Sequence, residues 1–137
     1  MPPGGNNIGR GMKVNKEELI GMYVVVDHFI VLEHEKEFKT WESQIAHIEN
    51  AIKPVNGVTT RVFVPQLGNV TPTLEVTWDN SIIKMTTSGL QEKLRNGNPS
   101  IEVISPDDKS IHITAWVMKP GQEKLVAKRL KEVLSAG

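Results

Sequence analysis

The chain has 137 residues, which suits one domain, and its 39% hydrophobic and 23% charged content is typical of a globular protein. Sixteen basic residues balance sixteen acidic ones, so the net charge at pH 7 is zero. This balance argues against a nucleic-acid coat protein and against a membrane-surface protein, because both classes need a basic excess.

Cysteine is absent, which excludes disulfides, thiolate metal sites and a cysteine nucleophile. The first eight residues carry neither a basic segment nor an apolar run, so no signal peptide is visible. The most apolar stretch, residues 22–32, contains Asp27 and His28 and is too short to span a bilayer. We therefore expect a cytoplasmic protein with no membrane partner.

Residues 1–14 form a basic loop rich in glycine and proline, and it leads to a predicted helix start. Asn15 can cap that helix, with Glu18 as the capping-box acid. Arg10 and Lys13 lie three residues apart just before the helix. Two cations beside free backbone N–H groups can bind an anion, although the residues alone favour a solvated basic loop.

Apolar residues then recur at helical spacing over residues 15–53, which predicts one long linking helix, with residues 33–37 as the place where it could break. Its first half is apolar on nearly all sides, which is typical of a helix covered by other structure. The valines and isoleucines there also suit a strand. The second half has a clean amphipathic face, formed by Phe38, Trp41, Ile45, Ile48 and Ile52.

Residues 54–137 predict a small α+β domain. Alternating residues predict strands at 58–64 and 73–78, which we expect to pair as an antiparallel hairpin. A helix at 88–95, strands at 100–104 and 111–118, and a final helix after Pro120 follow. The turn at 106–109 separates the last two strands. The predicted order is αββαββα: a long N-terminal helix, an antiparallel sheet of about four strands, and helices packed on one side.

Few side chains suggest chemistry on their own. The histidines at 28, 34, 47 and 112 show no metal-binding spacing, so we expect no metal site. Lys109 lies at a turn, where its amine should stay solvated rather than act as a catalytic group. We therefore expect no catalytic residue within this chain.

Five segments taken in order, residues 8–18, 57–65, 73–79, 94–103 and 119–122, resemble a known series. They are similar to the C-terminal region of fold-type-I pyridoxal-phosphate enzymes of the selenocysteine-synthase-like group. This group includes selenium transferase-related proteins and D-glucosaminate-6-phosphate ammonia-lyases. Glu102 falls near a position where the tRNA-dependent members carry an arginine, which favours the lyase-like branch.

The resemblance implies that the cofactor lysine and the phosphate-binding groups lie in an N-terminal domain that precedes the segment matched here. This chain would then be the small C-terminal domain with its linking helix, inactive alone and without bound pyridoxal phosphate. Its partners would be the missing cofactor domain and further copies in a homo-oligomer. Arg10 and Lys13 match a basic loop that holds anionic substrate groups in the family.

A second hypothesis remains open from the residues alone. The chain can be a free-standing α+β module that binds a small ligand or a protein on its sheet, because a fold does not choose a function. Nucleic-acid binding is a distant third, since no basic surface with stacking aromatic residues is visible.

Overall fold

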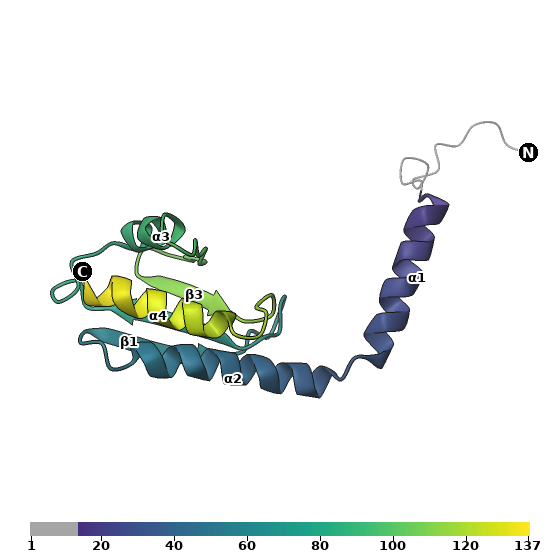
Figure 1. Ribbon diagram of the computed structural model, residues 1–137, viewed down its shortest axis with the longest axis horizontal. Helices are drawn as coiled ribbons and strands as arrows, with labels where there is room; N and C mark the ends of the chain where they lie inside the picture. Colours follow the sequence, from purple (N-terminus) through teal and green to yellow (C-terminus); the bar gives the residue numbers. More distant parts are fainter. Residues whose placement is uncertain (1–13) are drawn as a thin grey trace, which may run out of the picture. The chain divides into compact units, whose positions relative to one another are not determined.

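The computed structural model describes residues 14–137, which form four helices and three strands (Figure 1). The elements are α1 (Lys16–Val31), α2 (His34–Ile52), β1 (Val58–Phe63), β2 (Thr73–Trp78), α3 (Thr87–Arg95), β3 (Ser110–Thr114) and α4 (Gln122–Ser135). The order is therefore ααββαβα, an α+β architecture. The described chain divides into two compact units, one that ends at His34 and one that comprises Glu35–Gly137.

Two helices occupy the region where one long helix is predicted, and they separate at Leu32 and Glu33, at the edge of the stretch where a break is expected. α1 ends at Val31, and Leu32 adopts an extended conformation with φ −66° and ψ 137°. The carbonyl of Phe29 accepts hydrogen bonds at 3.3 Å from the Leu32 N–H and at 3.0 Å from the ring of His34. These contacts close the last turn of α1, and α2 then begins at His34.

A three-stranded antiparallel sheet in the order β1-β2-β3 forms the centre of the second unit. The predicted hairpin is confirmed, with Val58 opposite Trp78 and Phe63 opposite Thr73. β3 pairs with the other edge of β2, so that Leu74 lies opposite Ile113 and Glu75 opposite His112. This register places alternate side chains of all three strands on two distinct faces.

The predicted fourth strand at residues 100–104 is absent from the sheet. Only Ile104 bridges to His112, through backbone hydrogen bonds of 2.7 and 3.2 Å. The other backbone groups turn to α3: the N–H of Ile101 donates to the carbonyl of Leu94 at 3.1 Å, and the side-chain amide of Gln91 donates to the carbonyl of Val103, also at 3.1 Å. A backbone group bonded to α3 is not available to pair with β3.

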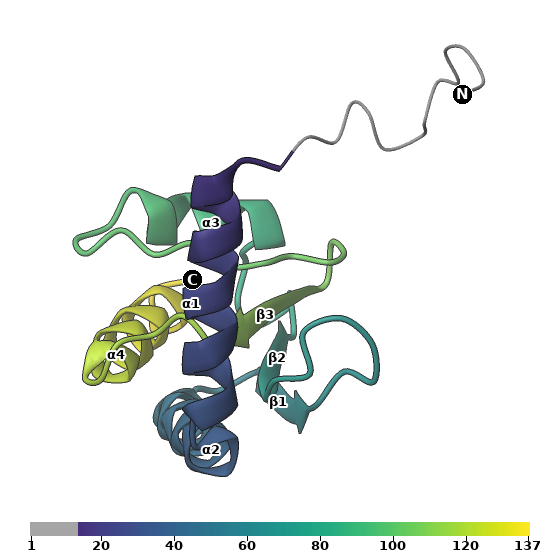
Figure 2. The same ribbon diagram turned by 90° about the vertical axis from the view of Figure 1, so that its right-hand side faces the viewer.

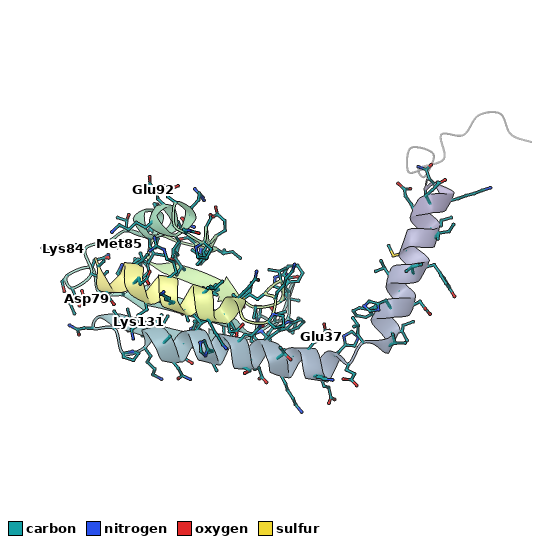
Figure 3. All side chains as sticks on the ribbon, viewed as in Figure 1. Glu37, Asp79, Lys84, Met85, Glu92 and Lys131 are labelled. Atoms are coloured by element: carbon teal, nitrogen blue, oxygen red, sulfur yellow. The ribbon has the colours of Figure 1, made fainter. Side chains whose placement is uncertain are left out.

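Helices cover one face of this sheet, and Figures 1 and 2 show α2 and α4 side by side along it. α3 contacts α4 and adds Leu90 and Leu94 to the same core. The buried apolar residues are Ile45, Ile48, Ile52, Leu74, Val76, Ile83, Met85, Leu90, Leu94, Ile111, Ile113, Ala115, Ala127, Leu130, Val133 and Leu134. Among these, Met85 lies at the end of the domain where the chain terminates (Figure 3).

Most helix faces of this unit match the sequence pattern. Ile45, Ile48 and Ile52 of α2 are fully enclosed, as their spacing predicts. Leu125 of α4 lies toward solvent, with half of its surface exposed. α3 begins one residue before the predicted Ser88, and Thr86 caps it by accepting a hydrogen bond from the Gly89 N–H at 3.1 Å.

α1 differs from the other helices, because none of its residues is buried. Figure 3 shows its side chains projecting around the helix. No helix within residues 14–137 is long and apolar enough to cross a membrane. The apolar side chains of α1 are therefore exposed.

We expect Leu94→Ala to lower the free energy of unfolding by about 2–5 kcal/mol, because the side chain is fully buried and its removal leaves a cavity. Leu125→Ala is the matched control and should change stability by no more than about 1 kcal/mol, because that side chain is half exposed. Urea denaturation followed by circular dichroism measures both variants. Equal losses would contradict this placement of the core.

Candidate functional site

The predicted anion-binding residues, Arg10 and Lys13, lie outside the described residues, so the basic loop stays a prediction. The helix start that follows it is described. Asn15 is the N-cap of α1, and its backbone N–H donates to a side-chain oxygen of Glu18 at 2.8 Å. This bond is the half of the capping box that satisfies the N-cap donor.

Large apolar side chains surround α1. Their exposed fractions run from 45% at Val26 to 73% at Ile30 and Val31. Leu19, Met22, Val26, Phe29 and Ile30 recur at helical spacing and form one broad stripe. Ile20, Val24 and Val31 form a second, narrower stripe beyond Asp27. An apolar surface of this extent on a protein marks a place where other structure packs.

The outer face of the sheet, opposite the core, carries a group of charged side chains in contact with one another. Thr59, Arg61 and Phe63 of β1 share this face with Thr73, Glu75 and Thr77 of β2 and with Ser110, His112 and Thr114 of β3. Four of these side chains, Arg61, Phe63, Glu75 and His112, touch one another and form the outer-face cluster. Strand pairing brings them together from positions up to 51 residues apart in the sequence, from Arg61 to His112.

Glu75 is the centre of the outer-face cluster. Arg61 donates two hydrogen bonds to its carboxylate, from Nε to Oε2 at 2.7 Å and from Nη2 to Oε1 at 3.1 Å. The Nε2 of His112 lies 3.5 Å from Oε1 of the same carboxylate. Phe63 completes the ring of contacts, because its centroid lies 4.9 Å from the guanidinium carbon of Arg61 and 5.4 Å from the His112 ring.

These contacts stabilise the ionised forms of the pair. The hydrogen bond from Arg61 lowers the pKa of Glu75 below its ordinary value, although partial burial opposes the shift; His112 adds a smaller effect in the same direction as Arg61. Glu75 in turn raises the pKa of Arg61. The cluster therefore holds a fixed carboxylate and a fixed guanidinium around neutral pH.

Two of the hollows among the helices and loops of this unit carry fewer ordered charged groups than the outer-face cluster. One, of about 580 Å³ between α3 and α4, is lined by Glu92, Lys93, Arg129 and Glu132, whose charges cancel. Arg129 is already engaged there, donating to Glu132 at 3.2 Å and to the carbonyl of Lys93 at 3.4 Å. The other, of about 230 Å³, is mainly apolar and lies between residues 99–103 and the start of α4.

No group of three metal-ligating side chains occurs within residues 14–137. Lys109 is exposed at the predicted turn, where the Oδ1 of Asp107 accepts hydrogen bonds from the backbone N–H groups of Lys109 and Ser110 at 2.9 and 2.7 Å. The hydrogen bond from the Lys109 N–H is the largest cause of the lowered pKa of Asp107. The segment is a hydrogen-bonded turn, and its lysine stays in solvent.

No local motif in the sequence identifies the outer-face cluster. The alternation that predicts β1 and β2 already places Arg61 and Glu75 away from the core, and this was the available signal. His112 could not be joined to them from sequence, because the pairing of β3 with β2 is a long-range contact.

Comparison with solved structures supports this fold. A structure of D-glucosaminate-6-phosphate ammonia-lyase superimposes on 95% of this chain with a TM-score of 0.69 and 18% sequence identity. The matched region covers 35% of the chain of that protein. No protein-family model and no curated protein sequence matches. The expected resemblance is confirmed at the level of the fold, and this chain corresponds to about a third of that ammonia-lyase.

Glu75→Gln tests the electrostatics of the cluster. Because the pKa of Glu75 is lowered by folding, its ionised form stabilises the fold above its ordinary value of 4.5, and this contribution disappears as the pH falls through the lower, folded-state pKa. We expect the stability difference between the native chain and Glu75→Gln to be present at pH 7 and to shrink below about pH 4.5.

Urea unfolding at pH 7, 5, 4 and 3 measures this difference. The exposed Glu42→Gln on α2 is the control. Parallel pH profiles for the native chain and Glu75→Gln would contradict the assigned pairing.

Proposed function

We propose that this chain is the small C-terminal domain of a pyridoxal-phosphate-dependent lyase or transferase of the selenocysteine-synthase-like family. The observation that carries the proposal is the agreement of the fold over 95% of this chain with only 35% of D-glucosaminate-6-phosphate ammonia-lyase. The five ordered sequence segments support the same assignment. In this proposal the domain contributes substrate contacts and packing surface, and the chemistry is performed elsewhere.

The exposure of the lysines indicates which domain would bind the cofactor. Pyridoxal phosphate, when bound, supplies the electron sink for bond cleavage next to an amine, and a lysine holds it as a Schiff base. Every lysine within residues 14–137 is solvent-exposed. An exposed ammonium keeps its proton and is a poor nucleophile. The described residues therefore do not fit the cofactor site, which we assign to the N-terminal domain.

Arg10 and Lys13 are the proposed substrate contacts. In the family resemblance their loop faces the active site and holds anionic groups of the substrate. A lysine at position 13, where selenocysteine synthases carry arginine, keeps the positive charge but loses the planar fork that binds oxyanions in a bidentate manner. We therefore assign Arg10 the main role in orienting the anion and Lys13 a supporting one.

The surface of α1 is the second proposed contribution. A 16-residue helix with no buried residue gains little stability from its own chain, since most helical stability comes from packing. The broad stripe from Leu19 to Ile30 would be covered by the cofactor domain. The narrow stripe of Ile20, Val24 and Val31 is then free to pack against a further subunit of a homo-oligomer.

A free-standing binding module is the second candidate function. It is favoured by the second unit, which encloses its own core of sixteen apolar residues without any help from α1. It leaves the apolar surface of α1 without a purpose. The behaviour of α1 in solution therefore discriminates between the two proposals.

We expect the full chain to self-associate through α1 at high concentration, because water disfavours so much exposed apolar surface. The double variant Val26→Glu/Ile30→Glu should be mainly monomeric, because it places two charges on the broad stripe. Thr40→Glu, at an exposed position of α2, is the matched control and should behave like the native chain. Sedimentation velocity over a concentration series measures all three.

A native chain that stays monomeric throughout the series would count against a packing role for α1 and favour the free-standing module. Oligomers that persist in the double variant would assign self-association to another surface.

A titration with pyridoxal phosphate tests the division of labour directly. We expect no saturable change in visible absorbance, and borohydride trapping followed by peptide mapping should give only scattered labelling of exposed lysines. A stoichiometric adduct at one lysine would overturn the proposal and make this chain a cofactor-binding protein in its own right.

A further inference from the structure

The outer face of the sheet is the side that the helices leave open. The opposite face is closed by α2, α3 and α4 through the shared core. The open face carries the hydroxyl groups of Thr59, Thr77 and Thr114 around the outer-face cluster, whereas Thr73 and Ser110 on the same face are buried. Polar groups that are held rigidly on an open sheet are well placed to bind a small polar ligand, because little conformational entropy is lost on binding.

Arg61 has donors to spare. A guanidinium has five N–H donors, and Glu75 takes one from Nε and one from Nη2. Three N–H donors therefore remain, and 64% of the side chain is exposed. The guanidinium is also oriented, since Glu75 holds one edge and the Phe63 ring lies beneath it. Both oxygens of Glu75 are occupied, so the exposed edge of the pair is a donor edge.

A second ion pair in the same unit shows what is unusual here. Arg95 binds Glu102 through the same two nitrogens, but both side chains are exposed, at 58% and 62%. At the outer-face cluster the acid is shielded to 22% exposure, and an aromatic ring and an imidazole are added. Of these two ion pairs, only the Arg61–Glu75 pair is contacted on several sides by residues of the sheet.

His112 supplies a second donor beside Arg61. Its ring is 20% exposed and faces Glu75 from β3, with Phe63 and Arg61 on β1 and the carboxylate of Asp107 in the adjoining turn as its other charged or aromatic neighbours. An imidazole ring carries an N–H group that can donate a hydrogen bond to an anion.

We propose that the outer-face cluster is a binding site for a small oxyanion, a carboxylate or a tetrahedral phosphate-like group, which bonds to the free edge of Arg61 with His112 as the second donor. Glu75 and Phe63 position the guanidinium. The site lies within residues that the structure describes and does not include Arg10 or Lys13. It therefore goes beyond the proposed function and does not depend on it.

Nuclear magnetic resonance of the full chain can test this site, by following the arginine Nε–H groups and the histidine rings. The probes are sulfate, which is a tetrahedral oxyanion, and gluconate, which presents a carboxylate on a polyol. Each is titrated at constant ionic strength at pH 7. A response to sulfate alone identifies a tetrahedral ligand, and a response to gluconate identifies a carboxylate.

We expect saturable shifts at Arg61 and His112. Arg61→Gln should weaken binding at least about tenfold, because it removes charge-assisted hydrogen bonds. Arg95→Gln, the matched control, should leave binding unchanged. His112→Gln should weaken binding less than Arg61→Gln does, because it removes the second donor and leaves the guanidinium in place.

Three outcomes would overturn the inference. Equal, non-saturating shifts at Arg61 and Arg95 would mean a general attraction of anions to exposed arginines. The absence of any response at Arg61 would mean that the pair is structural only. Saturable shifts at Arg10 that vanish in Arg10→Ala/Lys13→Ala, with none at Arg61, would exclude the outer-face site while leaving the proposed function intact.

Discussion

The burial of one face of a three-stranded sheet under three helices is the constraint on which the rest of the second unit depends. Leu74 and Val76 of β2 and Ile111 and Ile113 of β3 are almost fully enclosed by α2, α3 and α4. Because side chains alternate along a strand, this burial also decides which residues face outward. The outer-face cluster is therefore a consequence of the core as much as of its own ion pairs.

α1 shows no comparable burial. The second unit closes its core without α1, and every residue of α1 is exposed. A helix that is apolar on all sides is expected in the interior of a larger protein. The proposal of a missing cofactor domain and of subunit packing accounts for this surface, whereas a free-standing module does not.

The two proposed anion sites are of different kinds. Arg10 and Lys13 are assigned by resemblance to a loop that precedes a helix, where cations and backbone donors can act together. Arg61 and His112 are assigned by geometry, on a rigid sheet with a carboxylate and an aromatic ring that orient the guanidinium.

Local patterns in the sequence were enough to predict the cap at Asn15, the buried face of α2 and the hairpin of β1 and β2, because each depends on neighbouring residues. Tertiary structure alone decided two features. Residues 100–104 lie outside the sheet because Gln91 and Leu94 of α3 take their backbone hydrogen bonds, although their alternation suits a strand. Arg61, Glu75 and His112 meet because strands distant in sequence pair in one register, and that register follows from the shared core and not from any local signal.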